Sequence, residues 1–217
     1  MLPVWLTDTV TTDLDRAVHY TLLWGLEGMV LRTVGSAESR IPNVDEEKLG
    51  RRMRENDLPV PAVEPGLFSG PLGSPHQWMN EIMLARDVFT FCDRLGIGIV
   101  VVDAFAGEPG DRSVEELAEP LRELGDEASD RGVRVAVRNR SGTHAPTGSM
   151  LAELLDAVDH VWVGGAWAPA DGRAQGESLS DGLEVLGERI ELVSAPDCAF
   201  EGERSEEFAM EEVLRGL

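Results

Sequence analysis

The stretch IGIVVVDA, residues 97–104, is apolar at every position before Asp103. A strand that is apolar on both faces is typical of a parallel sheet whose two faces are covered. Just before it, residues 75–95 carry apolar side chains at steps of three and four, which predicts a helix with one buried stripe. Ser74 is a good N-cap for this helix, and Gly96 suits its end. Helix and strand together predict one unit of an alternating α/β fold.

The same alternation of strand and helix continues along the chain. Amphipathic segments separate the strands at spacings of roughly 25 to 40 residues, as expected for repeated βα units. No G-x-G-x-x-G motif follows the first strand, which counts against an open dinucleotide-binding sheet and favours a TIM-type (β/α) barrel. The seven expected strands are residues 4–6, 28–34, 60–64, 97–104, 133–138, 160–167 and 189–194.

We expect a single domain over residues 1–217, an incomplete barrel with seven βα units. A complete TIM barrel has eight strands, whereas this sequence ends at Leu217, just after an expected seventh helix, with no clear eighth strand. An incomplete barrel exposes a seam between its first and seventh strands, which a second copy or another subunit could cover. A homo-oligomer that covers the seam is therefore one expected assembly.

The composition is strongly acidic. Forty Asp and Glu residues oppose 19 Lys and Arg residues, and the formal net charge is −21. Such a field repels phosphate backbones, so nucleic-acid binding is not expected. A diffuse acidic surface with Lys48 as the only lysine favours a halophilic protein adapted to concentrated salt. The alternative is an ordinary acidic protein from a GC-rich genome.

Cysteine content and hydropathy indicate in which cellular compartment the protein is expected. Two cysteines, Cys92 and Cys198, are too few for a disulfide framework, which favours a reducing cytoplasm. The N-terminus has neither the basic region nor the apolar run of a signal peptide. The longest apolar runs, such as residues 97–102, are too short to span a bilayer. We therefore expect a cytoplasmic protein that does not bind membranes.

Functional groups of (β/α) barrels stand at the carboxyl ends of the strands and in the loops that follow. There, Glu64 and Asp103 could converge on a metal, but Arg138 brings a positive charge to the next strand. The four histidines show no metal-binding spacing. His144, after the fifth strand, is interpreted first as a loop-stabilising hydrogen-bond partner and second as an acid–base group. Trp167 is interpreted as barrel filling or as the wall of a small-ligand pocket.

Four segments in the second half of the chain resemble the xylose isomerase-like sugar phosphate isomerase/epimerase family of TIM barrels. They are residues 135–144, 151–159, 162–170 and 189–197. The order of elements from the first strand onward agrees with that family. The resemblance implies a TIM barrel, sugar substrates and a divalent metal held by residues at the strand ends.

The metal ligands of that family are replaced at the matching positions of this sequence. The glutamate that ends strand five is Arg138, followed by Asn139, and the aspartate that ends strand six is Ala168. A family histidine three residues further on is Asp171, the strand-seven histidine is Ser194, and the strand-eight glutamate has no counterpart. We therefore expect no metal, no other cofactor and no metal-dependent proton transfer.

The first functional hypothesis is a barrel that binds a small sugar or an anionic ligand without catalysis. A guanidinium near the family's metal position could hold a carboxylate or a phosphate, or could simply pair with Glu64 or Asp103. The plain ion pair is the simpler of these two interpretations. The residues assigned to ligand binding are Arg138, Asn139, Glu64, Asp103 and Trp167.

The alternative is an active isomerase- or epimerase-type enzyme with metal-independent acid–base chemistry. Its candidate acids and bases are His144, Asp171 and Asp197, which we expect near Arg138. A third hypothesis is an interaction protein that presents the open seam to a partner. The residue pattern does not choose among the three.

Overall fold

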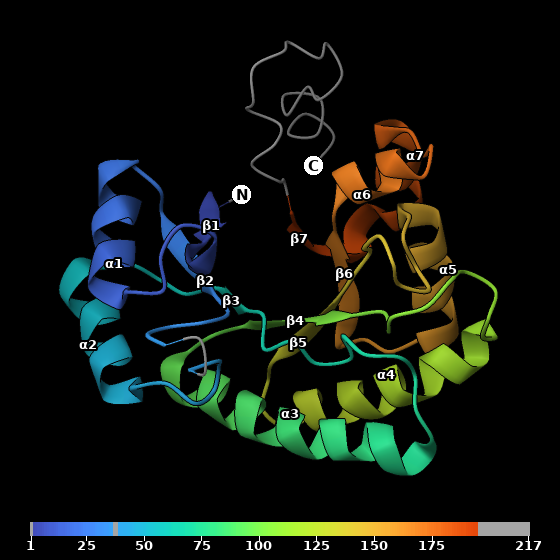
Figure 1. Cartoon of the computed structure of the whole chain (residues 1–217), viewed down its shortest axis with the longest axis horizontal. Coiled ribbons are helices and arrows are strands. Elements are labelled where there is room, and N and C mark those ends of the chain that lie inside the picture. The colour runs from blue at the N-terminus through green and yellow to red at the C-terminus, as the bar shows by residue number, and fades with distance from the viewer. Residues whose placement is uncertain (1, 37–38, 195–217) are drawn as a thin grey trace.

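The computed structural model describes residues 2–36 and 39–194. Its seven strands form one parallel sheet, in the order in which they occur along the chain. The sheet is curled into a half-barrel with the helices on its outer side (Figure 1). The strands are β1 (Val4–Leu6), β2 (Gly28–Leu31), β3 (Ala62–Val63), β4 (Ile99–Asp103), β5 (Arg134–Arg138), β6 (Val163–Trp167) and β7 (Ile190–Val193).

Within the described residues, helices alternate with the strands, which confirms the predicted incomplete TIM-type barrel. The helices are α1 (Leu14–Leu23), α2 (Glu46–Asn56), α3 (Pro75–Leu95), α4 (Val114–Ser129), α5 (Gly148–Val158), α6 (Pro169–Ala174) and α7 (Leu179–Leu186). Two short 3-10 turns, η1 (Thr7–Thr9) and η2 (Gly187–Arg189), follow β1 and precede β7. The short α6, directly after β6, is an element that the sequence pattern did not predict.

Helix α3 begins and ends where its sequence predicts. Ser74 forms a capping box with Gln77, which satisfies amides of the first turn. Gly96 ends the helix in the left-handed conformation with φ of 69°, which glycine adopts without steric cost. The predicted apolar stripe is buried in the core: Trp78, Ile82, Ala85, Phe89 and Cys92.

Each strand sends alternate side chains to opposite faces of the sheet, as strand geometry requires. Outward side chains such as Met29, Val100 and Val135 join the large core between sheet and helices. Inward side chains form a smaller cluster inside the half-barrel, here called the apolar layer. It consists of Val30, Ala62, Val101, Ala136 and Ala166, with Val4, Leu6, Ile99 and Leu192 packed against them.

All strands except β1 are shorter than their sequence pattern predicts, and β2, β3 and β6 show the difference clearly. β3 is only Ala62–Val63, β2 ends at Leu31, and β6 begins at Val163 rather than at position 160. His160 forms a turn instead: its carbonyl accepts a hydrogen bond from the Val163 amide, and its ring nitrogen accepts one from the Trp162 amide. Hydrogen bonds to the carbonyl and the ring of His160 therefore form a turn in place of the first three residues of the predicted strand.

The two edges of the sheet are β1, which pairs with β2, and β7, which pairs with β6. The expected second copy over this open seam stays a prediction. Asp197, Cys198 and the helix expected after the seventh strand lie outside the described residues. Among the helices of residues 2–36 and 39–194, none is long and apolar enough to cross a bilayer.

Candidate functional site

Five neighbouring strands place charged side chains inside the half-barrel, just beyond the apolar layer. Asp103 and Arg138 lie two residues after inward-facing residues of their own strands, so both face inward. Asp8, Arg32 and Glu64 follow the ends of their strands, and ion pairs join them to this set. Asp103 and Arg138 end β4 and β5 and are direct partners in the parallel register. We call this set the charged layer; it consists of Asp8, Arg32, Glu64, Asp103 and Arg138.

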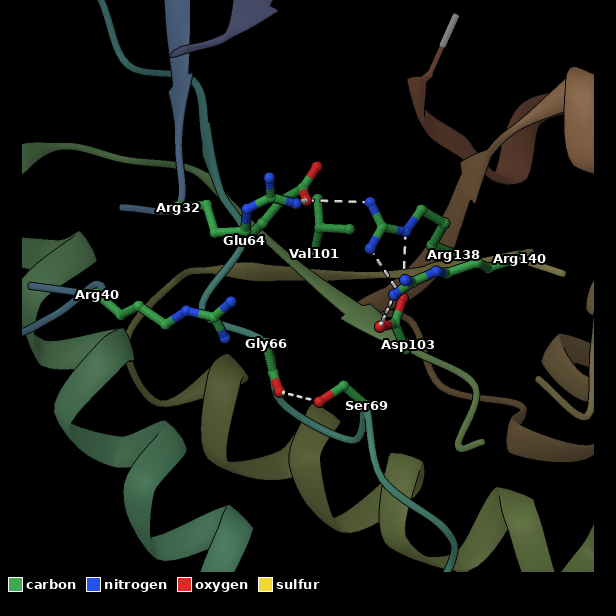
Figure 2. A pocket seen from close by; sticks show the side chains of 9 residues that line it. All are labelled: Arg32, Arg40, Glu64, Gly66, Ser69, Val101, Asp103, Arg138 and Arg140. Atoms are coloured by element: carbon green, nitrogen blue, oxygen red, sulfur yellow. Dashed lines mark hydrogen bonds and ion pairs between the residues drawn. The ribbon is translucent and has the colours of Figure 1, made fainter. Parts of the chain in front are cut away.

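Arg138 lies between the two central carboxylates of the charged layer (Figure 2). Its Nη1 donates to Glu64 Oε2 at 3.0 Å, and its Nε and Nη2 donate to Asp103 Oδ1 at 3.1 and 3.0 Å. All three nitrogens of the guanidinium are therefore engaged by buried acids. This geometry confirms that Arg138 pairs with Glu64 and Asp103, the simpler of the two predicted roles.

Two further arginines extend the ion pairs on either side. Arg140 Nη1 donates to Asp103 Oδ2 at 3.0 Å. Arg32 Nε donates to Asp8 Oδ2 at 2.9 Å, and its Nη1 lies 3.8 Å from Glu64 Oε2. Along the carboxyl ends of β1 to β5 the order is therefore acid, base, acid, acid, base, and each acid pairs with an arginine.

Arg138 is held as a permanent cation. Its side chain is 16% exposed. Burial by itself lowers the pKa of Arg138, but the charges of Glu64 and Asp103 and the hydrogen bonds to them more than offset burial, so that its pKa is raised. A buried charge of this kind is tolerated because its partners are close and well oriented.

A pocket of about 290 Å³ opens beside the charged layer. Four arginines and two carboxylates line it, a formal charge of +2, whereas the whole chain carries −21. Val101 supplies the single apolar side chain of the lining. The lining residues are Arg32, Arg40, Glu64, Gly66, Ser69, Val101, Asp103, Arg138 and Arg140.

The donor set of this pocket does not fit a divalent metal. Glu64 and Asp103 are suitable ligands by type, but the guanidinium of Arg138 binds both, and Arg140 occupies the second oxygen of Asp103. A cation would have to displace Arg138 and remain beside its charge. Within the part of the chain that the structure describes, no group of three or more His, Cys, Asp and Glu side chains is placed to hold a metal ion.

The other two positions that match family ligands carry side chains without strong donors. Ala168 and Ser194 follow β6 and β7, two residues beyond the inward-facing Ala166 and Leu192. They therefore continue the level of the charged layer around the half-barrel. The methyl group of Ala168 cannot coordinate a metal, and the neutral hydroxyl of Ser194 is a weak ligand.

Asn139 and Trp167, both predicted to touch a ligand, do not line the pocket. Asn139 is fully buried: its Oδ1 accepts from the Ala168 amide at 2.6 Å, and its Nδ2 donates to the carbonyls of Ala168 and Pro146. Trp167 is 1% exposed and belongs to the core outside the sheet. Both side chains face outward because each follows an inward-facing residue, so both are structural.

The candidate acids and bases are also engaged elsewhere. The Nδ1 atom of His144 lies 2.9 Å from the carbonyl of Glu108, and the imidazole packs against Gly107, which agrees with the predicted loop-stabilising role. Asp171 Oδ1 accepts from the Ser141 amide at 3.0 Å. Neither His144 nor Asp171 lines the pocket. Asp197 lies outside the described residues.

Two pocket arginines were not predicted from the sequence. Arg140 follows Arg138 by two positions, so strand alternation offered a signal for its inward direction. Arg40 had no such signal, because it lies nine residues after the end of β2 and returns to the sheet through a bridge with Thr33. Its place in the pocket depends on how the loop folds back.

The sequence pattern of the xylose isomerase-like TIM barrels matches residues 20–204. This chain belongs to that family. Membership confirms the resemblance predicted from the sequence. Among curated proteins, none matches the sequence of this family member.

Solved structures share the fold at low sequence identity. The 3-keto-D-glucoside 4-epimerase of E. coli aligns with a TM-score of 0.81 and 16% identity, over 100% of this chain and 87% of that one. A probable 3-DHS dehydratase of Bacillus anthracis gives 0.77 and 16%, over 100% and 88%. The D-allulose 3-epimerase of Methylomonas sp. gives 0.74 and 14%, over 88% and 71%. These likenesses establish the sugar epimerase-type fold, and the fold alone does not define an activity.

Proposed function

We propose that this protein binds a small anionic sugar derivative, a sugar acid or a sugar phosphate, in the pocket at the carboxyl ends of its strands, without a metal. The observation that carries the proposal is the charge of the lining: four arginines against two carboxylates, in a chain of net charge −21. Positive charge concentrated at the end of a barrel where ligands bind favours an anion.

The arginines of the pocket divide into scaffold and contact residues. Arg138 is the scaffold, because its three nitrogens are taken by Glu64 and Asp103. Arg140 is a contact residue: its side chain is 52% exposed, and one nitrogen is engaged by Asp103, which leaves donors facing solvent. Planar guanidinium groups suit carboxylates and phosphates because they donate two parallel hydrogen bonds.

The polar part of the lining fits the hydroxyl groups of a sugar. Ser69 Oγ, which donates to the Gly66 carbonyl, can still accept a hydrogen bond, and carboxylate oxygens of Glu64 and Asp103 are acceptors for hydroxyls. Two structural neighbours are described as epimerases of D-allulose and of a 3-keto-D-glucoside. We propose a sugar-like ligand for this chain by analogy with these neighbours, but not their epimerase activities.

Loss of metal-dependent catalysis is part of the proposal. It is supported by the guanidinium between Glu64 and Asp103 and by Ala168 and Ser194 at the matching ligand positions. The metal-independent enzyme is less well supported, because His144 and Asp171 bind loop backbone outside the pocket.

Calorimetric titration tests the proposal with two matched pairs: D-gluconate against D-glucitol, and D-glucose 6-phosphate against D-glucose. We expect the anion of at least one pair to bind about tenfold more tightly than its neutral partner, the effect of roughly one charged hydrogen bond. Arg140→Ala is expected to reduce this preference only in part, because three arginines of the lining remain. Arg51→Ala, an exposed arginine on α2, is the matched control and leaves it unchanged.

Two results of this experiment contradict the proposal. Equal affinity for the charged and neutral partners means that the arginines do not select an anion. An anion preference that survives Arg140→Ala but disappears with Arg51→Ala places the site elsewhere. Proton NMR of the same mixtures tests the enzyme alternative, since epimerised or isomerised sugar after incubation would establish catalysis.

We also propose that the protein works in a salt-rich cytoplasm. The support is the excess of 40 acidic over 19 basic residues, with one lysine. Screening reduces repulsion within such a surface, so the melting temperature is expected to rise between about 10 mM and 1 M KCl. A melting temperature that falls steadily over this range contradicts salt adaptation.

A further inference from the structure

We propose that Arg40 is the residue that selects the anionic group of the ligand, and that Gly66 leaves the space through which Arg40 reaches the pocket. This inference rests on the proposed function. It assigns the preference for an anion to one side of the pocket, near the loops that follow β2 and β3.

Arg40 differs from the other three arginines of the pocket in its partners. Arg32, Arg138 and Arg140 each donate to a carboxylate. Within the described residues, the guanidinium of Arg40 makes neither an ion pair nor a hydrogen bond, and Figure 2 shows it extended into the pocket without a partner. Its donors can therefore meet a ligand without first giving up a protein contact.

The backbone beneath Arg40 is nevertheless well anchored. Arg40 forms an antiparallel bridge with Thr33, and its carbonyl accepts from the Asn43 amide at 2.7 Å. The next amide, of Ile41, donates to the carbonyl of Arg32 at 3.1 Å, and the Ile41 side chain is buried. Because the backbone at Arg40 is already fixed, a ligand does not have to order it on binding, which suits a recognition residue.

Gly66 lies against the tip of this side chain. A Cβ atom at position 66 would lie 3.0 Å from Arg40 Nη1, tighter than most such contacts, so the guanidinium would have to shift by a few tenths of an ångström. The backbone of Gly66 has φ of 84°, a conformation that disfavours other residues, and its carbonyl accepts from Ser69 Oγ at 2.8 Å. The absence of a side chain and the fixed turn together make room for the guanidinium.

The position of Arg40 also orients the ligand. In Figure 2 Arg40 enters the pocket from the side opposite to Arg138 and Arg140. Carboxylates repel an anion, and Asp103 lies on the Arg138 side. The anionic group is therefore placed near Arg40 and Gly66, and the hydroxyl groups point toward Asp103.

The test is a double-mutant cycle measured by titration with D-gluconate and D-glucitol. Arg40→Ala is expected to weaken D-gluconate about tenfold and to leave D-glucitol unchanged. Gly66→Ala and Gly66→Asn are expected to weaken D-gluconate in the wild-type background and to have no further effect in the Arg40→Ala background. Asn tolerates positive φ better than Ala, so a loss shared by both variants reports the added Cβ rather than strain.

Gly110→Ala is the control for backbone strain. Gly110 has φ of 89°, and a Cβ atom there meets nothing within 4 Å. This variant is expected to keep the wild-type affinity for D-gluconate. Melting curves of each variant confirm that it is folded before binding is compared.

The outcomes separate this inference from the proposed function. If the wild-type protein shows no preference for D-gluconate over D-glucitol, both fail. If the wild type prefers D-gluconate and Arg40→Ala keeps that preference, the anion site stands and the role of Arg40 is wrong. If Gly66→Ala weakens D-gluconate equally in both backgrounds, Gly66 acts independently of Arg40 and its assigned role is wrong.

Discussion

The apolar layer and the charged layer lie on the same strands, two residues apart, and differ in every physical respect. The apolar layer has small aliphatic side chains that fill the half-barrel, including Val30, Ala62 and Ala136. The charged layer has three acids and two arginines, with Arg138 between Glu64 and Asp103. A change this abrupt is not needed for packing, because apolar side chains could continue to the strand ends. It distinguishes the carboxyl ends of the strands, where the pocket lies.

The comparison also shows where this chain differs from what the family resemblance implies. Relatives are expected to hold carboxylates together with a divalent cation, whereas here a guanidinium lies between Glu64 and Asp103. Arg138 and Arg140 together supply the two positive charges that match Glu64 and Asp103. The arginines at its margin, Arg40 and Arg140, then face the pocket.

Arg138→Ala is the strongest test of the charged layer. It leaves Glu64 and Asp103 buried without their main partner, and we expect a loss of about 3–5 kcal/mol in the free energy of unfolding. Urea denaturation measures it. Arg86→Ala, which removes an exposed ion pair with Glu127, is the matched control and is expected to change stability little. A small loss for Arg138→Ala would show that the ion pairs are incidental.

Asn139→Ala tests whether the strand ends that carry the charged layer depend on a buried clamp. The variant leaves the amide and carbonyl of Ala168 without their side-chain partners, and we expect a loss of about 2–3 kcal/mol. Ligand affinity per folded molecule is expected to be retained. An Asn139→Ala protein that keeps its stability but no longer binds the ligand would show that Asn139 takes part in ligand binding.

Val30→Ala tests the apolar layer itself. Two buried methyl groups are removed, and we expect a loss of about 2 kcal/mol from lost burial and the cavity that remains. Thermal and urea unfolding should agree. If Val30→Ala lowers the free energy of unfolding more than Arg138→Ala does, the apolar layer contributes more to stability than the ion pairs of Arg138, contrary to the expectation.

Arg40→Ala is expected to have the smallest effect on stability. The side chain is exposed and has no partner within the described residues, so the urea midpoint should stay within experimental error of the wild type. A clear loss of stability would mean that Arg40 supports the loop after β2 rather than a ligand.

The fold was largely predictable because apolar runs indicate buried segments and capping residues indicate where helices begin and end. Residues 97–104 and the capping box at Ser74 each identify an element without tertiary information. The pairing of Arg138 with Glu64 and Asp103 was predictable too, since parallel strands bring their carboxyl ends together. β3 was overestimated because Pro61, inside the predicted range, has no amide hydrogen for strand pairing.

The site was predicted less well for residues whose side-chain direction depends on the alternation along a strand or on the path of a loop. Asn139 and Trp167 follow Arg138 and Ala166, which face inward, so alternation alone turns both away from the pocket. That signal was present in the sequence. Arg40 was not predictable, because the return of its loop depends on bridging to Thr33, a contact within an irregular loop that no periodic pattern reports.

The most direct test of the central claim is a calorimetric titration of the chelator-treated protein with Mn²⁺. A guanidinium that occupies the space between Glu64 and Asp103 predicts no stoichiometric binding and no rise in melting temperature with Mn²⁺. Binding of one equivalent, lost in Glu64→Gln, would contradict the account, because it would show that the carboxylates of the charged layer still hold a metal.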